Sequence, residues 1–122
     1  MALPVDEQVY VTIEYLSAIA EFEFIKVWDK TDDVVYDVYP VGEVPRIPLM
    51  HEIQLIVKVK NVGGTAAYLF SKVYDDDTNE WLDTVESVPY PVAPGESWYD
   101  YLTPGRMPAR DWHLRVEAGH EY

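Results

Sequence analysis

The chain has 122 residues and a formal net charge of −13, from 22 acidic and 9 basic side chains. Such a surface repels phosphate backbones and anionic lipid, so we expect neither nucleic acid nor membrane surfaces as partners. Hydrophobic residues make up 48% and aromatic residues 14% of the sequence, which excludes a disordered composition and fits one folded domain over residues 1–122.

The chain contains no cysteine, which excludes disulfides, thiolate metal sites and cysteine nucleophiles. No stretch approaches the roughly 18 apolar residues of a membrane span. The N-terminus carries acids and a proline where a secretory signal has a basic start and an apolar run, so we expect no signal peptide and no membrane insertion.

The first predicted strand covers residues 8–16, which are rich in β-branched side chains that alternate with polar ones. A helix is the alternative, because Val9, Ile13, Leu16 and Ala20 also fit helical spacing. We favour the strand because β-branched residues are poor helix formers.

Residues 20–49 predict two strands joined by a turn, followed by a connection. Residues 20–28 predict a strand, in which the alternation slips at Phe24-Ile25 as a β-bulge would make it do. Residues 31–33 predict a turn and residues 34–39 a hairpin partner. Residues 41–49 hold two prolines and a glycine, which predicts an extended connection or an edge.

Residues 50–64 predict a central strand that runs into a tight turn. One face of this strand is apolar and is expected in the core: Ile53, Leu55, Val57 and Val59. The turn is expected at residues 61–64, where Asn61, Gly63 and Gly64 tolerate positive φ.

Four more strands are predicted over residues 66–74, 81–88, 96–102 and 111–118, with loops at 75–79, 89–95 and 103–110. The expected inward residues of the first and last of these are Ala67, Leu69, Val73, Trp112, Leu114, Val116 and Ala118. In the first strand the opposite face, with Tyr68, Phe70 and Tyr74, is also apolar and is the alternative inward face. Seven to eight short antiparallel strands without a convincing helix indicate an all-β, immunoglobulin-like β-sandwich.

The second half, about residues 50–118, resembles the CARDB-type (cell-adhesion-related) immunoglobulin-like domains of bacteria and archaea. The resemblance lies in the strand at 53–60 with Asn61-Val62-Gly63, the turn Pro94-Gly95-Glu96-Ser97 and the closing Leu114-Arg115-Val116-Glu117. Ala118-Gly119 replaces the family's closing acidic residue, and residues 1–49 lack a clear counterpart. The resemblance implies an immunoglobulin-like fold used for adhesion, spacing or assembly, with no catalytic residues to transfer.

The acidic segment from residue 75 has the oxygen spacing of a calcium loop, beginning with Asp75, Asp77 and Asn79. Glu80 stands where such a loop needs glycine, and strands flank it where helices are required. We therefore interpret the segment as a hydrated turn and favour no metal or cofactor, with calcium at these three residues as the alternative. The histidines are too widely spaced for a zinc pair.

Aromatic residues are the best candidates for binding a partner. Those that we expect at an interface are Tyr68, Phe70, Tyr74, Trp98, Tyr99 and Tyr101. We predict no enzyme but a structural or adhesive subunit of a homo- or hetero-oligomeric assembly, acting through protein–protein contacts as a virion or capsid-decoration protein or at a cell surface. The alternative is a carbohydrate-binding module that stacks exposed Trp and Tyr rings on a glycan.

Overall fold

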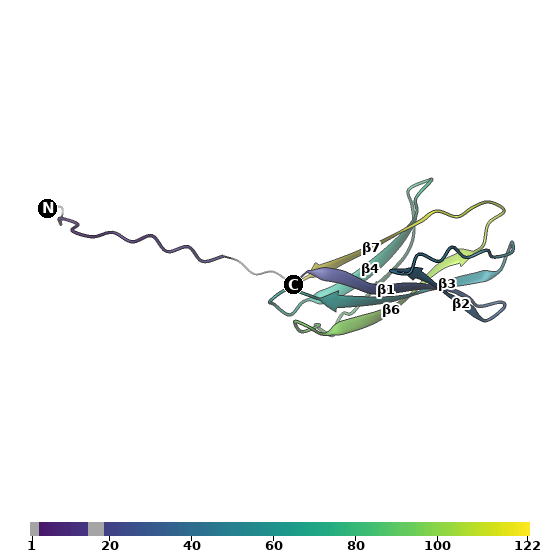
Figure 1. Ribbon diagram of the computed structural model, residues 1–122, viewed down its shortest axis with the longest axis horizontal. Helices are drawn as coiled ribbons and strands as arrows, with labels where there is room; N and C mark the ends of the chain where they lie inside the picture. Colours follow the sequence, from purple (N-terminus) through teal and green to yellow (C-terminus); the bar gives the residue numbers. More distant parts are fainter. Residues whose placement is uncertain (1–2, 15–18) are drawn as a thin grey trace.

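The computed structural model describes residues 3–14 and 19–122, and the described chain is all-β (Figure 1). Its strands are β1 (Ala20–Asp29), β2 (Val34–Tyr39), β3 (Glu52–Asn61), β4 (Tyr68–Asp75), β5 (Glu80–Glu86), β6 (Ser97–Arg106) and β7 (Leu114–Glu121). They form an antiparallel four-stranded sheet, in the order β2-β1-β3-β6, that packs on a three-stranded sheet, in the order β5-β4-β7. The predicted immunoglobulin-like sandwich is confirmed, with seven strands.

Strand β3 lies inside the larger sheet, between β1 and β6. Its four predicted core residues, Ile53, Leu55, Val57 and Val59, are at most 3% exposed. The residues between them are partly exposed on the outer face. The alternation therefore identified both faces of β3 correctly.

The core joins the two sheets. Leu69 and Val73 of β4 and Leu102 of β6 are fully buried in one cluster with the β3 residues. Burial of each such side chain contributes roughly 1.5–3 kcal/mol. The predicted inward residues of β4 are confirmed, and Ala67 forms an isolated bridge with Val92.

A β-bulge in β1 is confirmed, but it lies at Glu23 and not at Phe24-Ile25 as predicted. The register with β3 shifts between Phe22 and Phe24, so that Glu23 has no partner residue, and the register with β2 shifts between Ile25 and Lys26. The extra residue reverses the alternation along β1. Phe24 consequently shares the outer face of the sheet with Lys58, which lies opposite it.

The predicted strand at residues 8–16 is wrong for residues 8–14, which the structure places outside any strand; residues 15 and 16 lie outside the described residues. Residues 3–14 run away from the sandwich as an extended arm (Figure 1). The alternation is that of a strand, but a strand needs a neighbour that pairs with its backbone groups. The described chain supplies no such neighbour to the arm.

Strand β6 is longer than expected, because it continues through residues 103–106, which were predicted as a loop. Pro104 is tolerated there since β6 is an edge strand and the missing N–H leaves no ladder partner unpaired. The register shift between Ile53 and Leu55 accommodates the irregular stretch. The connection predicted over residues 41–49 is confirmed, because it contains no strand.

The predicted tight turn at residues 61–64 is a crossing from one sheet to the other. Among the described glycines, positive φ occurs at Gly42, Gly95 and Gly105 but not at Gly63 or Gly64. The buried Asn61 side chain directs the chain instead: its Oδ1 accepts the Gly63 N–H at 2.9 Å. Its Nδ2 donates to the carbonyls of Thr65 and Val92 at 2.9 and 3.0 Å.

Strand β7 closes the smaller sheet and pairs with β4. The inward residues predicted for this part of the chain, Trp112, Leu114, Val116 and Ala118, pack against the core but remain partly exposed. The polar turns predicted at residues 31–33 and 75–79 connect β1 to β2 and β4 to β5. Across the described residues, no helix is long and apolar enough to cross a membrane.

Candidate functional site

The outer face of the four-stranded sheet gathers aromatic rings and lysines. We call it the aromatic–lysine face, and it consists of Phe24, Lys26 and Trp28 of β1, Ile56, Lys58 and Lys60 of β3, and Tyr99 and Tyr101 of β6. Pairing places them together, since residues directly opposite each other point to the same face. Lys58 lies opposite both Phe24 and Tyr99, and Ile56 lies opposite Tyr101.

The rings and lysines of this face contact one another. The ring centroids of Phe24 and Tyr99 are 5.9 Å apart and their planes are inclined by 58°. The ammonium of Lys58 lies 5.5 Å from the Tyr99 centroid, and that of Lys26 lies 5.0 Å from the Phe24 centroid. At these distances the ring quadrupole attracts the cation.

Glu23, the extra residue of the bulge, anchors one of these lysines. Its Oε2 lies 3.0 Å from Lys58 Nζ, and its Oε1 accepts a short hydrogen bond from the Ser97 hydroxyl. The Ser97 hydroxyl and Lys58 together lower the pKa of Glu23, and Glu23 raises the pKa of Lys58. The bulge therefore positions a charged pair beside the aromatic rings.

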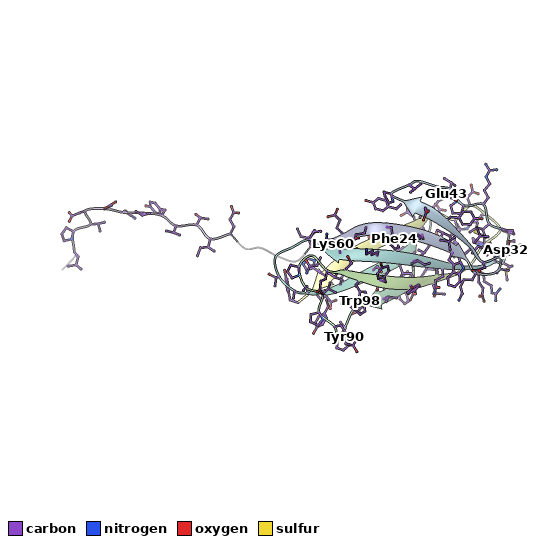
Figure 2. All side chains as sticks on the ribbon, turned by 60° about the horizontal axis from the view of Figure 1, so that its bottom comes forward. Phe24, Asp32, Glu43, Lys60, Tyr90 and Trp98 are labelled. Carbon is purple, nitrogen blue, oxygen red and sulfur yellow. The ribbon has the colours of Figure 1, made fainter. Side chains whose placement is uncertain are left out.

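The distribution of positive charge is uneven. Four of the five lysines lie on or beside the aromatic–lysine face, since Lys30 lies 5.5 Å from the Trp28 ring. Tyr99 and Tyr101 are 51% and 52% exposed. Figure 2 shows Phe24 near the middle of this sheet and Lys60 toward one end. Aromatic rings presented by a rigid sheet are suited to contact with another macromolecule.

Trp98 does not belong to this face. It packs against the core, opposite Val59, and stacks on Tyr90 with centroids 6.1 Å apart (Figure 2). Tyr90, in the connection that precedes β6, is 64% exposed. Trp98 therefore supports the sheet from inside, while Tyr99 and Tyr101 project outward.

The remaining aromatic candidates, Tyr68, Phe70 and Tyr74, lie on the outer face of the other sheet, all partly buried. The Phe70 ring lies directly over Gly119, where a Cβ atom would collide with it. The guanidinium of Arg115 lies 4.6 Å from the Tyr74 centroid. Residues of this chain already cover much of this aromatic surface.

The structure thus divides the six predicted interface residues. Two lie on one outer face, three on the other, and Trp98 lies on the inner side of β6. It also adds Phe24, Trp28 and the neighbouring lysines, which the sequence analysis did not select. The predicted slip at Phe24-Ile25 left Phe24 on the same face as Phe22. The bulge lies earlier, at Glu23, and turns Phe24 and the following even-numbered residues of β1 outward.

The acidic turn is paired with cations. Asp75 forms a short ion pair with Arg110, whose hydrogen bond lowers the pKa of Asp75. Asp77 lies 2.9 Å from His113 Nδ1 and raises the pKa of that imidazole. Asn79 Oδ1 accepts a hydrogen bond from Arg115 at 2.6 Å. The three residues considered for calcium thus each have a positively charged partner within the chain.

A different group could hold a metal by its residue types. One ligand atom each from Asp29, Asp32 and His51 lies within 4.8 Å of the others. Asp29 is 2% exposed, and its Oδ2 lies 2.9 Å from His51 Nδ1. Its Oδ1 accepts the N–H groups of Thr31 and Asp32 at 3.1 and 3.3 Å.

Burial alone would raise the pKa of Asp29, but the hydrogen bonds from His51 and the Asp32 and Thr31 amides lower it. The group fixes the β1–β2 turn to the chain that enters β3. Sequence reasoning missed it because 22 residues separate Asp29 from His51. We interpret it as a structural ion pair, since both Asp29 oxygens already have partners.

One buried carboxylate lies between the sheets. Asp100 of β6 is fully buried, and its Oδ2 accepts the Ser71 hydroxyl of β4 at 2.5 Å. Its Oδ1 has no hydrogen-bond partner in the described chain. Burial raises the pKa of Asp100 to about 6, although hydrogen bonds from Ser71 and Trp98 act in the opposite direction.

One lateral side of the sandwich is closed. β5 of the smaller sheet meets β6 of the larger sheet there, at the edges of both. The Asp83 carboxylate of β5 accepts the backbone N–H of Thr103 of β6 at 2.8 Å. The Ser71–Asp100 hydrogen bond also joins the two sheets, from β4 to β6. The two sheets are therefore joined by polar bonds on this side.

The opposite side is open, and we call its cavity the open groove. It has a volume of about 870 Å³ and lies between β1 and β2 of one sheet and β7 of the other. Its apolar lining includes Ile25, Val27, Val38, Ile47, Leu114 and Val116. Within the described residues β7 pairs with β4 alone, so its other backbone edge is free.

Comparisons with family models, with curated proteins and with solved structures found no match for this chain. The resemblance of residues 50–118 to CARDB-type domains therefore stays a prediction.

Proposed function

We propose that this protein is a non-catalytic structural or adhesive subunit of a larger assembly, in a virion or at a cell surface. It binds another protein subunit through the aromatic–lysine face. The observation that carries this proposal is the collection of rings on one sheet face, with three of the five lysines on that face and a fourth beside it, in a chain whose net charge is −13.

The chemistry of the face supports this role. Tyr and Trp are enriched at protein interfaces because they offer large contact areas with few rotatable bonds. Tyr99 and Tyr101 rise from a sheet, so little further order is lost when a partner covers them. Lys58 and Lys26 already pair with Glu23 and Asp37 of this chain, so Lys60 is the lysine of the face that would favour a carboxylate of the partner.

The distribution of lysines provides a direct test. Purified chain and the same chain in its native source are treated with an amine-reactive reagent, and modification is measured by mass spectrometry. We expect Lys26, Lys58 and Lys60 to react more slowly in the native source. Lys72, on the outer face of the smaller sheet, is the internal control and should react equally in both. Equal reactivity of all four lysines in both samples would contradict the proposal.

A pair of variants tests which face binds. Tyr101→Ala should restore the reactivity of Lys26 and Lys58 in the native source by removing a central contact. Tyr68→Ala changes the outer face of the other sheet and should leave the protection unchanged. The opposite result would assign the partner to the face that carries Tyr68, Phe70 and Tyr74.

A carbohydrate-binding module is the second candidate, because Tyr90 and Tyr101 are 64% and 52% exposed and could stack on sugar rings. A glycan array tests it with Tyr101→Ala as the variant. Trp98→Ala is a poorer choice, since Trp98 packs on the core. Absence of binding to any glycan would remove this candidate.

A further inference from the structure

We propose that the extended arm of one copy of this chain adds to the free edge of β7 in a second copy and fills its open groove. This inference rests on the proposed role as an assembly subunit and specifies how copies join. It uses residues separate from the aromatic–lysine face.

The arm has the composition of a strand without a sheet. Its odd-numbered positions are apolar with one exception, and these side chains are between 74% and 90% exposed: Leu3, Val5, Val9, Val11 and Ile13. The even-numbered positions are mostly polar: Pro4, Asp6, Gln8, Tyr10, Thr12 and Glu14. An exposed apolar row of this kind indicates a contact surface, and its period of two suits β-pairing.

The acceptor is the edge of β7 together with the groove beside it. Leu114 and Val116 point inward yet stay partly exposed, whereas Leu69 and Val73 of the neighbouring β4 are fully buried. Residues 44–47 of the connection line part of the groove, but no described strand pairs with β7 on this side, so its inward side chains stay partly exposed. An added strand would pair with β7 and cover these side chains.

The strand arrangement leaves a vacant position at this place. The smaller sheet has three strands and the larger has four, and β7 faces β1. No described strand of the smaller sheet faces β2 in the same way. The eight residues of β7 span about 26 Å, and the arm of residues 3–14 is long enough to cover that length.

One charged residue of the arm has a possible partner of opposite charge in the groove. Glu7 is the one residue that interrupts the apolar row. Arg46 lines the groove and forms no ion pair with any described residue. Asp111 also lines the groove, near the start of β7, so the position of Arg46 favours an arrangement in which Glu7 lies toward the 41–49 connection.

The occupant is a second copy because the arm extends away from the groove of its own chain (Figure 1). Each copy then offers one arm and one groove, so the contact is heterologous. Repetition of such a contact produces a chain of subunits, or a ring if the rotation closes.

Sedimentation of the full-length chain across a concentration series tests the proposal. We expect species larger than a monomer, whose fraction rises with concentration. Val11→Asp, on the apolar row, should reduce the association at least tenfold. Thr12→Asp adds the same charge on the even-numbered row of the arm and should change the association less than twofold. Equal effects of the two variants, or a monomer at every concentration, would overturn the proposal.

Because the chain has no cysteine, disulfide trapping gives an independent readout. A chain with Val11→Cys is mixed with a longer, tagged chain that carries Val116→Cys, and the mixture is oxidised. We expect a mixed dimer that does not form when Thr12→Cys replaces Val11→Cys. A bond within one chain that carries both Val11→Cys and Val116→Cys, in a monomer, would show that the arm returns to its own groove and would refute the contact between copies.

The two proposals can fail separately. The arm variants leave Lys26, Lys58 and Lys60 unchanged, so the lysine protection of the native assembly still reports on the aromatic–lysine face. Self-association that Val11→Asp abolishes, without lysine protection, supports the arm contact and contradicts the proposed function of the face.

Discussion

The closed and open sides of the sandwich are built from strands of similar sequence pattern, yet they differ in what covers their inward residues. On the closed side, β5 and β6 meet and Leu102 is fully buried. On the open side, Leu114 and Val116 carry the same alternation and remain partly exposed beside a groove. Alternation determines which way a side chain points, but burial depends on a neighbour.

The polar groups differ as well. The closed side contains a hydrogen bond between the sheets, from Thr103 N–H to Asp83, and the buried Ser71–Asp100 pair. The edge of β7 on the open side presents backbone groups that no described residue pairs. A free strand edge beside exposed apolar side chains is a site where another strand can add.

Core truncation should give the largest difference between the sides. Leu102→Ala should reduce the free energy of unfolding by about 3 kcal/mol, because a fully buried leucine leaves a cavity. Leu114→Ala should reduce it by only about 1 kcal/mol in the monomer, since solvent already reaches this side chain. Urea denaturation at low protein concentration measures both. Equal losses would mean that the two sides are equally closed.

The buried carboxylate makes the closed side sensitive to pH. The pKa of Asp100 is raised to about 6, so the folded state retains a proton that the unfolded chain releases near pH 4. The contribution of this group to stability is therefore complete below about pH 4 and is lost as pH rises through about 6.

Asp100→Asn should remove this dependence, so that the variant gains stability relative to the natural chain as pH increases from 4 to 7. Urea midpoints of both chains over this range provide the test. Comparison between the chains is essential, because Asp29 and Asp75 have lowered pKa values and lose stabilisation as pH falls. A constant difference across the range would contradict the assignment.

The bond between β5 and β6 should have a smaller effect. Asp83→Ala removes the acceptor of the Thr103 N–H, which we expect to reduce stability by about 1 kcal/mol. Hydrogen exchange at the Thr103 amide should accelerate, while exchange in β3 should change little. Unchanged exchange at Thr103 would indicate that this hydrogen bond does not hold the side closed.

The outer face should be the least sensitive of all. Tyr101 is 52% exposed and has no core role, so Tyr101→Ala should alter the free energy of unfolding by less than about 0.5 kcal/mol. Thermal unfolding checks this value. A larger loss would mean that the ring stabilises the sheet, and the variant could not then be used as a probe of binding.

The sequence predicted correctly the strands that have a neighbouring strand on each side, such as β1 and β3. Residues 53–60 alternate between a buried and a partly exposed row, and β3 follows that pattern in the sheet. The bulge near Phe24 was also visible, because an extra residue shifts the phase of the alternation. These features depend on local order in the sequence.

Other features depend on which elements become neighbours, and the sequence does not specify that. Val9, Val11 and Ile13 have the pattern of a strand but no partner in the described chain. Asp29 and His51 meet although 22 residues separate them. Tyr99 and Tyr68 have similar sequence settings, and only the order of strands places them on opposite faces.

Hydrogen exchange along β7 tests the central claim most directly. The β7 amides that do not bond to β4 should exchange quickly in dilute solution and become protected as concentration rises, because the arm of another copy then pairs with them. Val11→Asp should abolish this protection and Thr12→Asp should retain it. Protection of these amides that is already complete at the lowest concentration, or absent at the highest, would contradict strand addition between copies.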